Sequence, residues 1–343
     1  FRGGYDFDFL ADEASLASRI AMRFLKDSGL LQRDIKKSLA VYQNQLEDII
    51  KKYSIDIIEM PDYNDYMRFC KSVVLFPKLS VPVTVKMHGT ITYFKNEANQ
   101  PAPAYILKME QAILNQGTAI SSVSKYTAEK SALYLSYPKE ITVLYNGIDT
   151  DVPAANFTRR PKQVIFTGSL AEKKGIYQLA KAWNIVNKAI PDARLLVLGK
   201  GPQQKVRDYL NAGTNSSVIF NGHVTTEELY KHLKESVISV FPSYAEAFAL
   251  APLEAMACGT AVINSNRTSG PELIAHEING LLVNPDDVEQ IASSIIYLLN
   301  NSDVCAQLAK KGNEGVRERF EISKIAAENL TFYQEVLASA PKV

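Results

Sequence analysis

Residues 237–274 read VISVFPSYAEAFALAPLEAMACGTAVINSNRTSGPELI and hold the pattern that decides the fold. An apolar run typical of a strand ends at a Pro-Ser pair, a short loop follows, and a helix begins at or just before Leu250. Pro252 falls in the first turn of this helix and Gly259 just past its end, which are the positions that helices favour for these residues. A second apolar run follows at 261–263. This order of strand, helix and strand predicts a right-handed crossover between parallel strands.

The same rhythm runs through most of the chain. Apolar runs predict strands over residues 55–59, 81–86, 119–122, 141–144, 164–167, 193–198, 218–220, 237–241, 261–263 and 281–283. Amphipathic stretches predict helices over residues 34–53, 105–114, 126–136, 175–188, 205–210 and 288–299. The strands are continuously apolar, as in sheets that helices cover on both faces. The predicted fold class is therefore α/β.

The length of 343 residues is about twice the usual ~150 residues of a domain, which favours two domains. Residues 149–162 (DTDVPAANFTRRPK) are rich in Pro, Asp, Asn and basic side chains and lack a period, as expected for a linker. We predict an N-terminal domain over 1–152 and a second domain over 153–322. A C-terminal helix in residues 323–343 packs on one of them, with a return to the first domain as the expectation.

Composition excludes several classes of protein. Thirty-eight basic and 37 acidic residues give a net charge of +1, whereas binding to nucleic acid needs clustered positive charge. The sequence contains no run of ~18 apolar residues, so no membrane-spanning helix is expected. The three cysteines are far apart and no secretion signal is recognisable, so we expect a cytoplasmic protein whose membrane contact, if any, is peripheral and on the inner face. Histidines and cysteines do not share metal-ligand spacing, so no metal site is expected.

The start of the helix in the quoted segment predicts an anion site, because its first backbone N–H groups, near Phe248, Ala249 and Leu250, have no partner within the helix. Glu246 lies before it and Glu254 about one turn inside. Carboxylates only accept hydrogen bonds, and hydroxyls donate them. A phosphate between two hydroxyl-bearing groups suits this layout, and a nucleotide sugar has it. The alternative is that Glu246 caps the helix and Glu254 is a solvated or paired surface residue.

A lysine follows one of the predicted strands. Residues 164–175 read VIFTGSLAEKKG: a strand, a turn of small residues and two lysines before a helix. Lys174 would lie beyond the carboxyl end of the strand, where open α/β sheets bind ligands, and could neutralise a diphosphate. The alternative is a solvated loop lysine.

Two further turns follow strands. Residues 195–202 (LLVLGKGP) place Gly199 in a tight turn that is neither a complete dinucleotide fingerprint nor a phosphate-binding P-loop. Residues 83–90 (VTVKMHGT) place His88 at a strand end beside a glycine, from where it could face a ligand. The alternative for His88 is a structural role.

These segments together resemble the large family four of retaining glycosyltransferases. The matching motifs, in order, are His88-Gly89, Asn146-Gly147-Ile148-Asp149, the turn from Gly168 to Lys174-Gly175, Gly199-x-Gly201-Pro202, and Glu246-x7-Glu254-Ala-Met-Ala-x-Gly259. The match runs from about residue 83 to 271, and the last motif is its most specific part. The resemblance implies the GT-B fold, with two facing Rossmann-like domains, parallel sheets and an interdomain cleft. It also implies retaining transfer of a hexose from a nucleoside diphosphate sugar, UDP favoured, to a glycan or lipid-linked acceptor, without metal or other cofactor.

The resemblance implies a role for each matched residue. Glu246 would bind hydroxyls of the donor sugar, Glu254 the ribose, and Lys174 the diphosphate, together with the amides near Ala249. His88 would approach the sugar from the opposite domain. The nucleotide pocket would be lined by Gly168, Ser169, Gly199, Val224, Phe248, Ala249 and Leu250.

The chain departs from the family at several positions. Ser169 stands where the family usually has arginine, and Ala249 where it usually has glycine. Lys173 or Lys200 could supply the missing charge. The first glycine-rich loop of the family has only Gly3-Gly4 as a candidate, so part of the first domain is expected to be missing.

Other interpretations start from other features. Asp6-x-Asp8 and Asp149-x-Asp151 resemble the metal-binding triplet of the other glycosyltransferase fold, but neither has a matching context. A nucleotide-sugar epimerase or a phosphorylase on the same fold is one rival. A non-catalytic module that binds sugar nucleotides is another, and Ser169 favours it.

Overall fold

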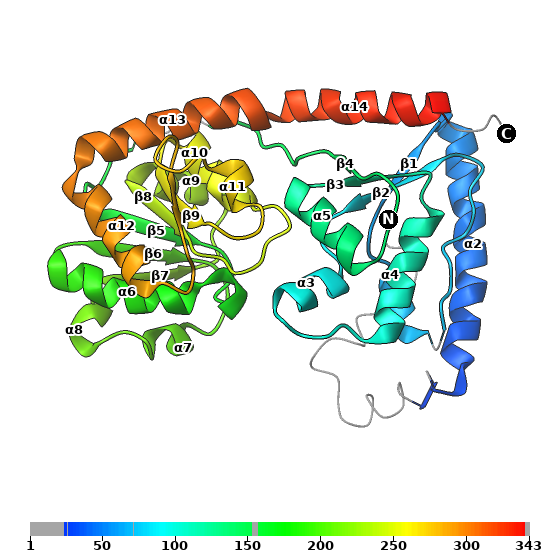
Figure 1. Cartoon of the computed structure of the whole chain (residues 1–343), viewed down its shortest axis with the longest axis horizontal. Coiled ribbons are helices and arrows are strands. Elements are labelled where there is room, and N and C mark those ends of the chain that lie inside the picture. The colour runs from blue at the N-terminus through cyan, green and yellow to red at the C-terminus, as the bar shows by residue number, and fades with distance from the viewer. Residues whose placement is uncertain (1–23, 26, 71, 153–156, 340–343) are drawn as a thin grey trace. The chain divides into compact units, whose positions relative to one another are not determined.

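The computed structural model describes residues 24–25, 27–70, 72–152 and 157–339. Contacts between residues divide the chain into two units. Unit 1 comprises Phe1–Ser122, Ala128–Val143 and Leu330–Val343; unit 2 comprises Val123–Thr127 and Leu144–Asn329 (Figure 1). Each described unit contains a parallel sheet with helices, which confirms the α/β prediction. Gly3-Gly4 and Asp6-x-Asp8 lie outside the described residues.

The described part of unit 1 is built on the parallel strands β1 (Ile58–Pro61), β2 (Val83–Met87), β3 (Ala119–Ser122) and β4 (Thr142–Val143), which are neighbours in that order. The accompanying helices are α2 (Leu30–Tyr53), η2 (Asp65–Phe69), α3 (Ile91–Glu97), α4 (Ala104–Gln116) and α5 (Lys125–Tyr134). Fully buried apolar side chains of β2, β3 and α4 form the core of this unit, among them Val85, Ile113 and Leu114. The hydrophobic effect on these side chains holds sheet and helix together.

Two buried carboxylates hold the turn after β2. Asp62 Oδ2 accepts the amides of His88 and Gly89, each at 3.1 Å. Glu110 of α4 accepts the amides of Ile91, at 2.8 Å, and Thr92. Burial raises the pKa of Asp62 to about 7, and the Glu110 carboxylate acts in the same direction. Burial also raises the pKa of Glu110. The backbone of this turn is therefore fixed by side chains from two other elements.

Unit 2 contains a six-stranded sheet among its described residues, with all neighbours parallel and in the order β10-β9-β8-β5-β6-β7. Its strands are β5 (Gln163–Thr167), β6 (Arg194–Leu198), β7 (Val218–Gly222), β8 (Ile238–Phe241), β9 (Ala261–Ser265) and β10 (Leu281–Val283). The helices are η3 (Glu172–Lys174), α6 (Ile176–Ala189), α7 (Gln203–Arg207), α8 (Ala212–Asn215), α9 (Thr226–Glu235), α10 (Leu250–Ala257), α11 (Gly270–Leu273), α12 (Val288–Asn300), α13 (Ser302–Phe320) and, up to Asn329, the first part of α14 (Ile322–Ser339). Helices α6 and α12 pack together, as do α10 and α13, so helices cover both faces of the sheet (Figure 1).

The core of unit 2 is larger than that of unit 1. All residues of β5, β8 and β9 are buried, as expected for strands covered on both faces. Trp183 of α6 is fully buried among them, and its indole N–H donates to Ser217 Oγ at 2.9 Å. This bond satisfies the polar atom of the side chain inside the core.

The sheet of unit 2 changes direction between β5 and β8. From β5 the chain adds β6 and β7 on one side, and then returns to add β8 and β9 on the other. The pairing of β5 with β8 runs through Val164–Ile238 and Ile165–Ser239, and stops before the carboxyl ends of both strands. Such a switch point is where open α/β sheets bind ligands.

Gly175 brings the two loops at this switch point together. It adopts a left-handed conformation with φ of 70°, and a Cβ atom here would lie 1.8 Å from Pro242 O. The amide of Tyr244 donates to Lys173 O at 2.8 Å. The loop after β5 can therefore lie against the loop after β8 only because residue 175 has no side chain.

The sequence predicted every strand of the described sheets, with ends shifted by a few residues. The largest shift is at β1, which begins at Ile58 rather than at residue 55, because Ser54 ends α2 in a left-handed conformation and the chain needs three residues to reach the sheet. Helix α7 spans Gln203–Arg207 instead of 205–210. The predicted helices do not include α3, α9 and α13, nor the one-turn helices α8 and α11. Leu233 is the one large apolar residue among the buried residues of α9, and small residues such as Ala309 and Gly312 interrupt the buried face of α13.

The residue just before the segment predicted as a linker is bonded to other parts of unit 2. Ile148 exchanges backbone hydrogen bonds with Phe320 and Ile322, both at 2.9 Å. The contact-based division places residues from Leu144 in unit 2 and those from Leu330 in unit 1. In unit 1, Tyr333 of α14 donates to Glu59 Oε2 at 2.7 Å.

Gly175→Ala should destabilise the protein by about 3 kcal/mol or more, since left-handed strain and a clash with Pro242 add together. Gly213→Ala is the matched control, because no atom lies within 4 Å of a Cβ at that helical position. Urea unfolding followed by circular dichroism would give both free energies of unfolding. Equal values for the two variants would contradict the role of Gly175.

Asp62→Asn should flatten the pH dependence of stability between about pH 4 and 7. The pKa of Asp62 is raised from 3.8 to about 7 in the fold, so the native state keeps a proton that the unfolded chain releases, and stability falls as pH rises through this window. The asparagine has no proton to release, and the difference amounts to up to about 4 kcal/mol. Urea unfolding at a series of pH values measures it, and parallel profiles for variant and wild type would contradict the assignment.

Candidate active site

Lys174 and Glu246 form an ion pair at the switch point of unit 2. Lys174 ends η3, after β5, and Glu246 lies in the loop after β8. Lys174 Nζ lies 2.5 Å from Glu246 Oε1, and the side chains are 28% and 18% exposed. Both ends of the pair therefore remain within reach of a ligand. The sequence predicted both residues as site residues but not that they touch.

The loop that carries Glu246 is anchored by hydrogen bonds to residues 124 and 127. Ala247 O accepts the hydroxyls of Ser124 and Thr127 at 2.6 and 2.9 Å, and both hydroxyl residues are fully buried. Nearby, Glu272 accepts the amides of Lys125 and Tyr126, both at 2.8 Å. Sequence analysis missed Glu272, although it lies in the quoted segment, because its partners are about 150 positions away.

The start of α10 is open. Its N-cap residue, Ala249, has an extended backbone and makes no side-chain cap. Within the described part of the chain, the amides of Phe248 and Leu250 have no hydrogen-bond acceptor. By contrast, Thr225 and Glu228 close the start of α9 with a reciprocal capping box. The amides at the start of α10 are therefore available to an anion, whereas the start of α9 is already capped.

Glu254 lies one turn inside α10, as predicted. Its side chain is half-buried, and burial raises its pKa. No hydrogen bond or ion pair of this carboxylate is found among the described residues. Tyr230 of α9 lies close enough that the Glu254 charge, after burial, raises the pKa of the phenol. An unpaired acceptor of this kind suits donor hydroxyls.

The glycine turns after β5 and β6 are bonded to each other and to β7. Gly168 donates to Leu198 O at 3.0 Å, and Gly199 donates to Gly222 O at 2.6 Å. A Cβ on Gly199 would lie 1.9 Å from Gly168 O, so the two turns touch through backbone. The exposed Ser169 follows the first turn, and the half-buried Val224 lies between β7 and α9. The structure thus brings the predicted pocket residues of unit 2 to one edge of its sheet.

His88 belongs to unit 1 and is described apart from these residues. It follows β2 in the turn held by Asp62, and its side chain is only partly accessible to solvent. Partial burial and the nearby Lys86 lower the pKa of its imidazole. Sequence analysis did not identify Asp62 or Glu110, because both bind backbone amides, which no side-chain motif marks.

The second Asp-x-Asp triplet is engaged within the protein. Asp149 Oδ1 accepts the amide of Asp151 at 2.8 Å, and Asp151 pairs with Arg317 at 3.4 Å. Across the described ranges, no three His, Cys, Asp or Glu side chains gather as metal ligands would. None of the helices that the structure describes has the length and apolarity to cross a bilayer.

Two family models match the chain, one on each side of the segment near residue 150. Residues 3–152 match the model described as Glycosyltransferase Family 4, and residues 148–315 match that of Glycosyl transferases group 1. Together they cover the region of both described sheets.

A curated relative and two solved structures show the extent of the likeness. The GDP-mannose-dependent alpha-(1-6)-phosphatidylinositol monomannoside mannosyltransferase of Mycobacterium tuberculosis is 27% identical over 240 residues, which is 64% of this chain and 62% of that protein. The chain thus matches less than two thirds of the length of the first curated relatives.

Among solved structures, sucrose-phosphate synthase of Thermosynechococcus elongatus has a TM-score of 0.71 at 22% identity, over 89% of this chain and 79% of its own. HepE of Anabaena in complex with UDP has a TM-score of 0.61 at 18% identity, over 74% of this chain and 72% of its own. Structural similarity of this kind establishes the fold. The chain has the GT-B fold and belongs to the family-four-like group of glycosyltransferases.

Proposed function

We propose that this protein transfers a hexose from a nucleoside diphosphate sugar to a glycan or a lipid-linked acceptor, with retention of configuration and without a metal ion. The observation that carries the proposal is the Lys174–Glu246 pair beside the uncapped start of α10. A cation and free amides suit a diphosphate, and the adjacent carboxylate suits the hydroxyls of a sugar.

The charges fit the demands of the reaction. Departure of the nucleoside diphosphate leaves positive charge on the anomeric carbon and negative charge on the phosphates. We assign Lys174 and the amides of Ala249 and Leu250 to the phosphates, where the negative charge would develop, because preorganised donors of this kind lower the barrier most. These groups supply the positive charge that a metal ion would otherwise supply to the diphosphate, and this supports a reaction without metal.

The carboxylates are proposed to hold the two sugars of the donor. Glu246 would accept hydroxyls of the hexose and Glu254 those of the ribose, each with oxygen atoms that a ligand can reach. By the family resemblance, His88 is assigned to the donor sugar. We propose that the leaving phosphate takes the proton of the acceptor on the same face. This route accounts for retention.

Two donor bases compete. A UDP-sugar is the first proposal, supported by HepE of Anabaena, which was solved with UDP. A GDP-sugar is the second, supported by the name of the mycobacterial mannosyltransferase. The acceptor is proposed to bind in unit 1, where the segments over 61–69 and 90–102 contain the short helices η2 and α3. A cytoplasmic location, with the acceptor presented at the inner face of a membrane, completes the proposal.

Thermal-shift measurements against a panel of nucleotide sugars test the donor. A ligand at 100 times its Kd stabilises the fold by about 2.7 kcal/mol, so the true donor should raise the melting temperature clearly. We expect UDP-sugars to give the largest shift, and the shift to persist in excess EDTA. No shift with any member would contradict the proposal. Binding without transfer or hydrolysis would favour the non-catalytic module that Ser169 suggests.

Lys174→Ala and Glu246→Ala should each lower transfer at least ~100-fold, the scale seen when one charge-stabilising group is lost. They should differ in binding. The lysine variant should bind UDP itself more weakly, whereas the glutamate variant should bind UDP normally and lose affinity only for the sugar-bearing donor. Steady-state transfer assays and calorimetry on both variants measure these effects.

Lys188→Ala is the matched control for the lysine, because it removes an exposed lysine from the far end of the helix that follows Lys174. Its transfer rate and its affinity for UDP should equal those of the wild type. Near-wild-type turnover in either site variant would remove that residue from the mechanism.

A further inference from the structure

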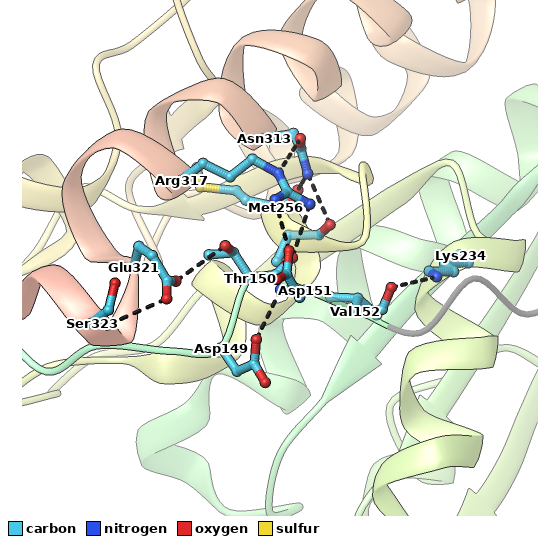
Figure 2. Close-up of polar contacts among 11 residues, drawn as sticks. Asp149, Thr150, Asp151, Val152, Lys234, Met256, Asn313, Arg317, Glu321 and Ser323 are labelled. Atoms are coloured by element: carbon cyan, nitrogen blue, oxygen red, sulfur yellow. Dashed lines mark hydrogen bonds and ion pairs between the residues drawn. The ribbon is translucent and has the colours of Figure 1, made fainter.

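Helix α10 is held at its carboxyl end by a side chain of α13. Asn313 Nδ2 donates to Met256 O at 3.0 Å and to Ala257 O at 2.8 Å (Figure 2). Both carbonyls lie in the last turn of α10, where the helix itself provides too few donors. Asn313 therefore caps a helix to which it does not belong.

Arg317 connects this cap to the segment that follows Ile148. Its Nε donates to Asn313 Oδ1 at 3.2 Å, and its Nη2 donates to Thr150 O at 2.9 Å (Figure 2). Its ion pair with the exposed Asp151 is a weak addition. One planar guanidinium thus bridges α13 and the backbone of residue 150, which a lysine could not do with the same geometry.

The same segment is bonded at further points. Thr150 Oγ1 donates to Glu321 Oε2 at 3.1 Å, and Lys234 Nζ donates to Val152 O at 3.4 Å (Figure 2). Residues 150–152 are therefore fixed along their length. They give Arg317 a rigid partner.

The amino end of α10 contacts α13 as well. Phe248, just before α10, packs against Phe320 with ring centroids 5.8 Å apart, and Tyr145 packs on both rings at 5.6 and 5.5 Å. Phe248 and Phe320 are buried. Both ends of α10 are thus held by α13 and by residues 145–152, the first through aromatic packing and the second through Asn313 and Arg317.

We propose that Asn313 and Arg317 are positioning residues for the donor site. By holding the carboxyl end of α10, they set the direction in which its amino end presents amides and in which Glu254 points. The inference rests on the proposed function, because α10 is the helix assigned to the diphosphate. Small displacements of binding groups are costly, so the bonds that hold the carboxyl end of α10 matter for the groups presented at its start.

Asn313→Ala should weaken UDP binding roughly three- to thirtyfold, the range for residues that act on a site through its support. Calorimetry well below the melting temperature measures the folded protein, so a merely structural role would lower stability and leave this Kd unchanged. Arg317→Ala should weaken binding in the same direction. The double variant should be no worse than Asn313→Ala, because the two residues act in series.

Lys310→Ala is the matched control, since this lysine lies on the exposed side of the same helix. It should bind UDP like the wild type. Unchanged binding in both Asn313→Ala and Arg317→Ala would overturn the inference while the proposed function stands. If Asn313→Ala does not fold, Arg317→Ala decides alone, because the Arg317 side chain is about half exposed, at 47%, and its removal disturbs the core less.

Hydrogen exchange of unliganded protein separates this inference from the proposed function. If the wild type binds neither UDP nor GDP, the proposed function fails. The amides of residues 250–257 should still exchange faster in Asn313→Ala and Arg317→Ala than in Lys310→Ala. Equal exchange in all three variants would overturn the positioning role itself.

Discussion

The backbone contact between Gly175 and Pro242 is the constraint on which the site of unit 2 depends. It places the loop after β5 against the loop after β8, at the point where the strand order reverses. Lys174 precedes the glycine directly, and Glu246 follows the proline by four residues. Their ion pair is thus a consequence of the sheet topology and of the absence of a side chain at Gly175, rather than of attraction between two mobile side chains.

Around this contact, some polar groups form hydrogen bonds within the protein, and others remain available to a ligand. Ala247 O is taken by two buried hydroxyls, and the start of α9 is closed by Thr225 and Glu228. The start of α10 and the Glu254 carboxylate are left open. A buried network that satisfies some groups fully and leaves neighbouring ones open is a means of selecting one ligand orientation.

Local pattern was sufficient for the strands and for α10, because apolar runs and the placement of Pro252 and Gly259 depend on near neighbours in the chain. It was insufficient for α13, whose buried face mixes large apolar residues such as Leu308 and Phe320 with small ones such as Gly312, which lies close to Met256. The Lys174–Glu246 bond joins residues 72 positions apart and requires the order of the strands, which no period reveals. Asp62 is not identified by sequence pattern either, because its partners are backbone amides, which every non-proline residue has.

The single tryptophan of the chain, Trp183, lies fully buried in the core of unit 2. Indole emission therefore reports the unfolding of this unit alone, whereas far-ultraviolet ellipticity reports both. Since the two sheets have separate cores, the two signals need not change at the same denaturant concentration, and a single free energy for the whole chain is justified only where they coincide. The protein thus carries an intrinsic optical probe of the unit that contains Lys174 and Glu246.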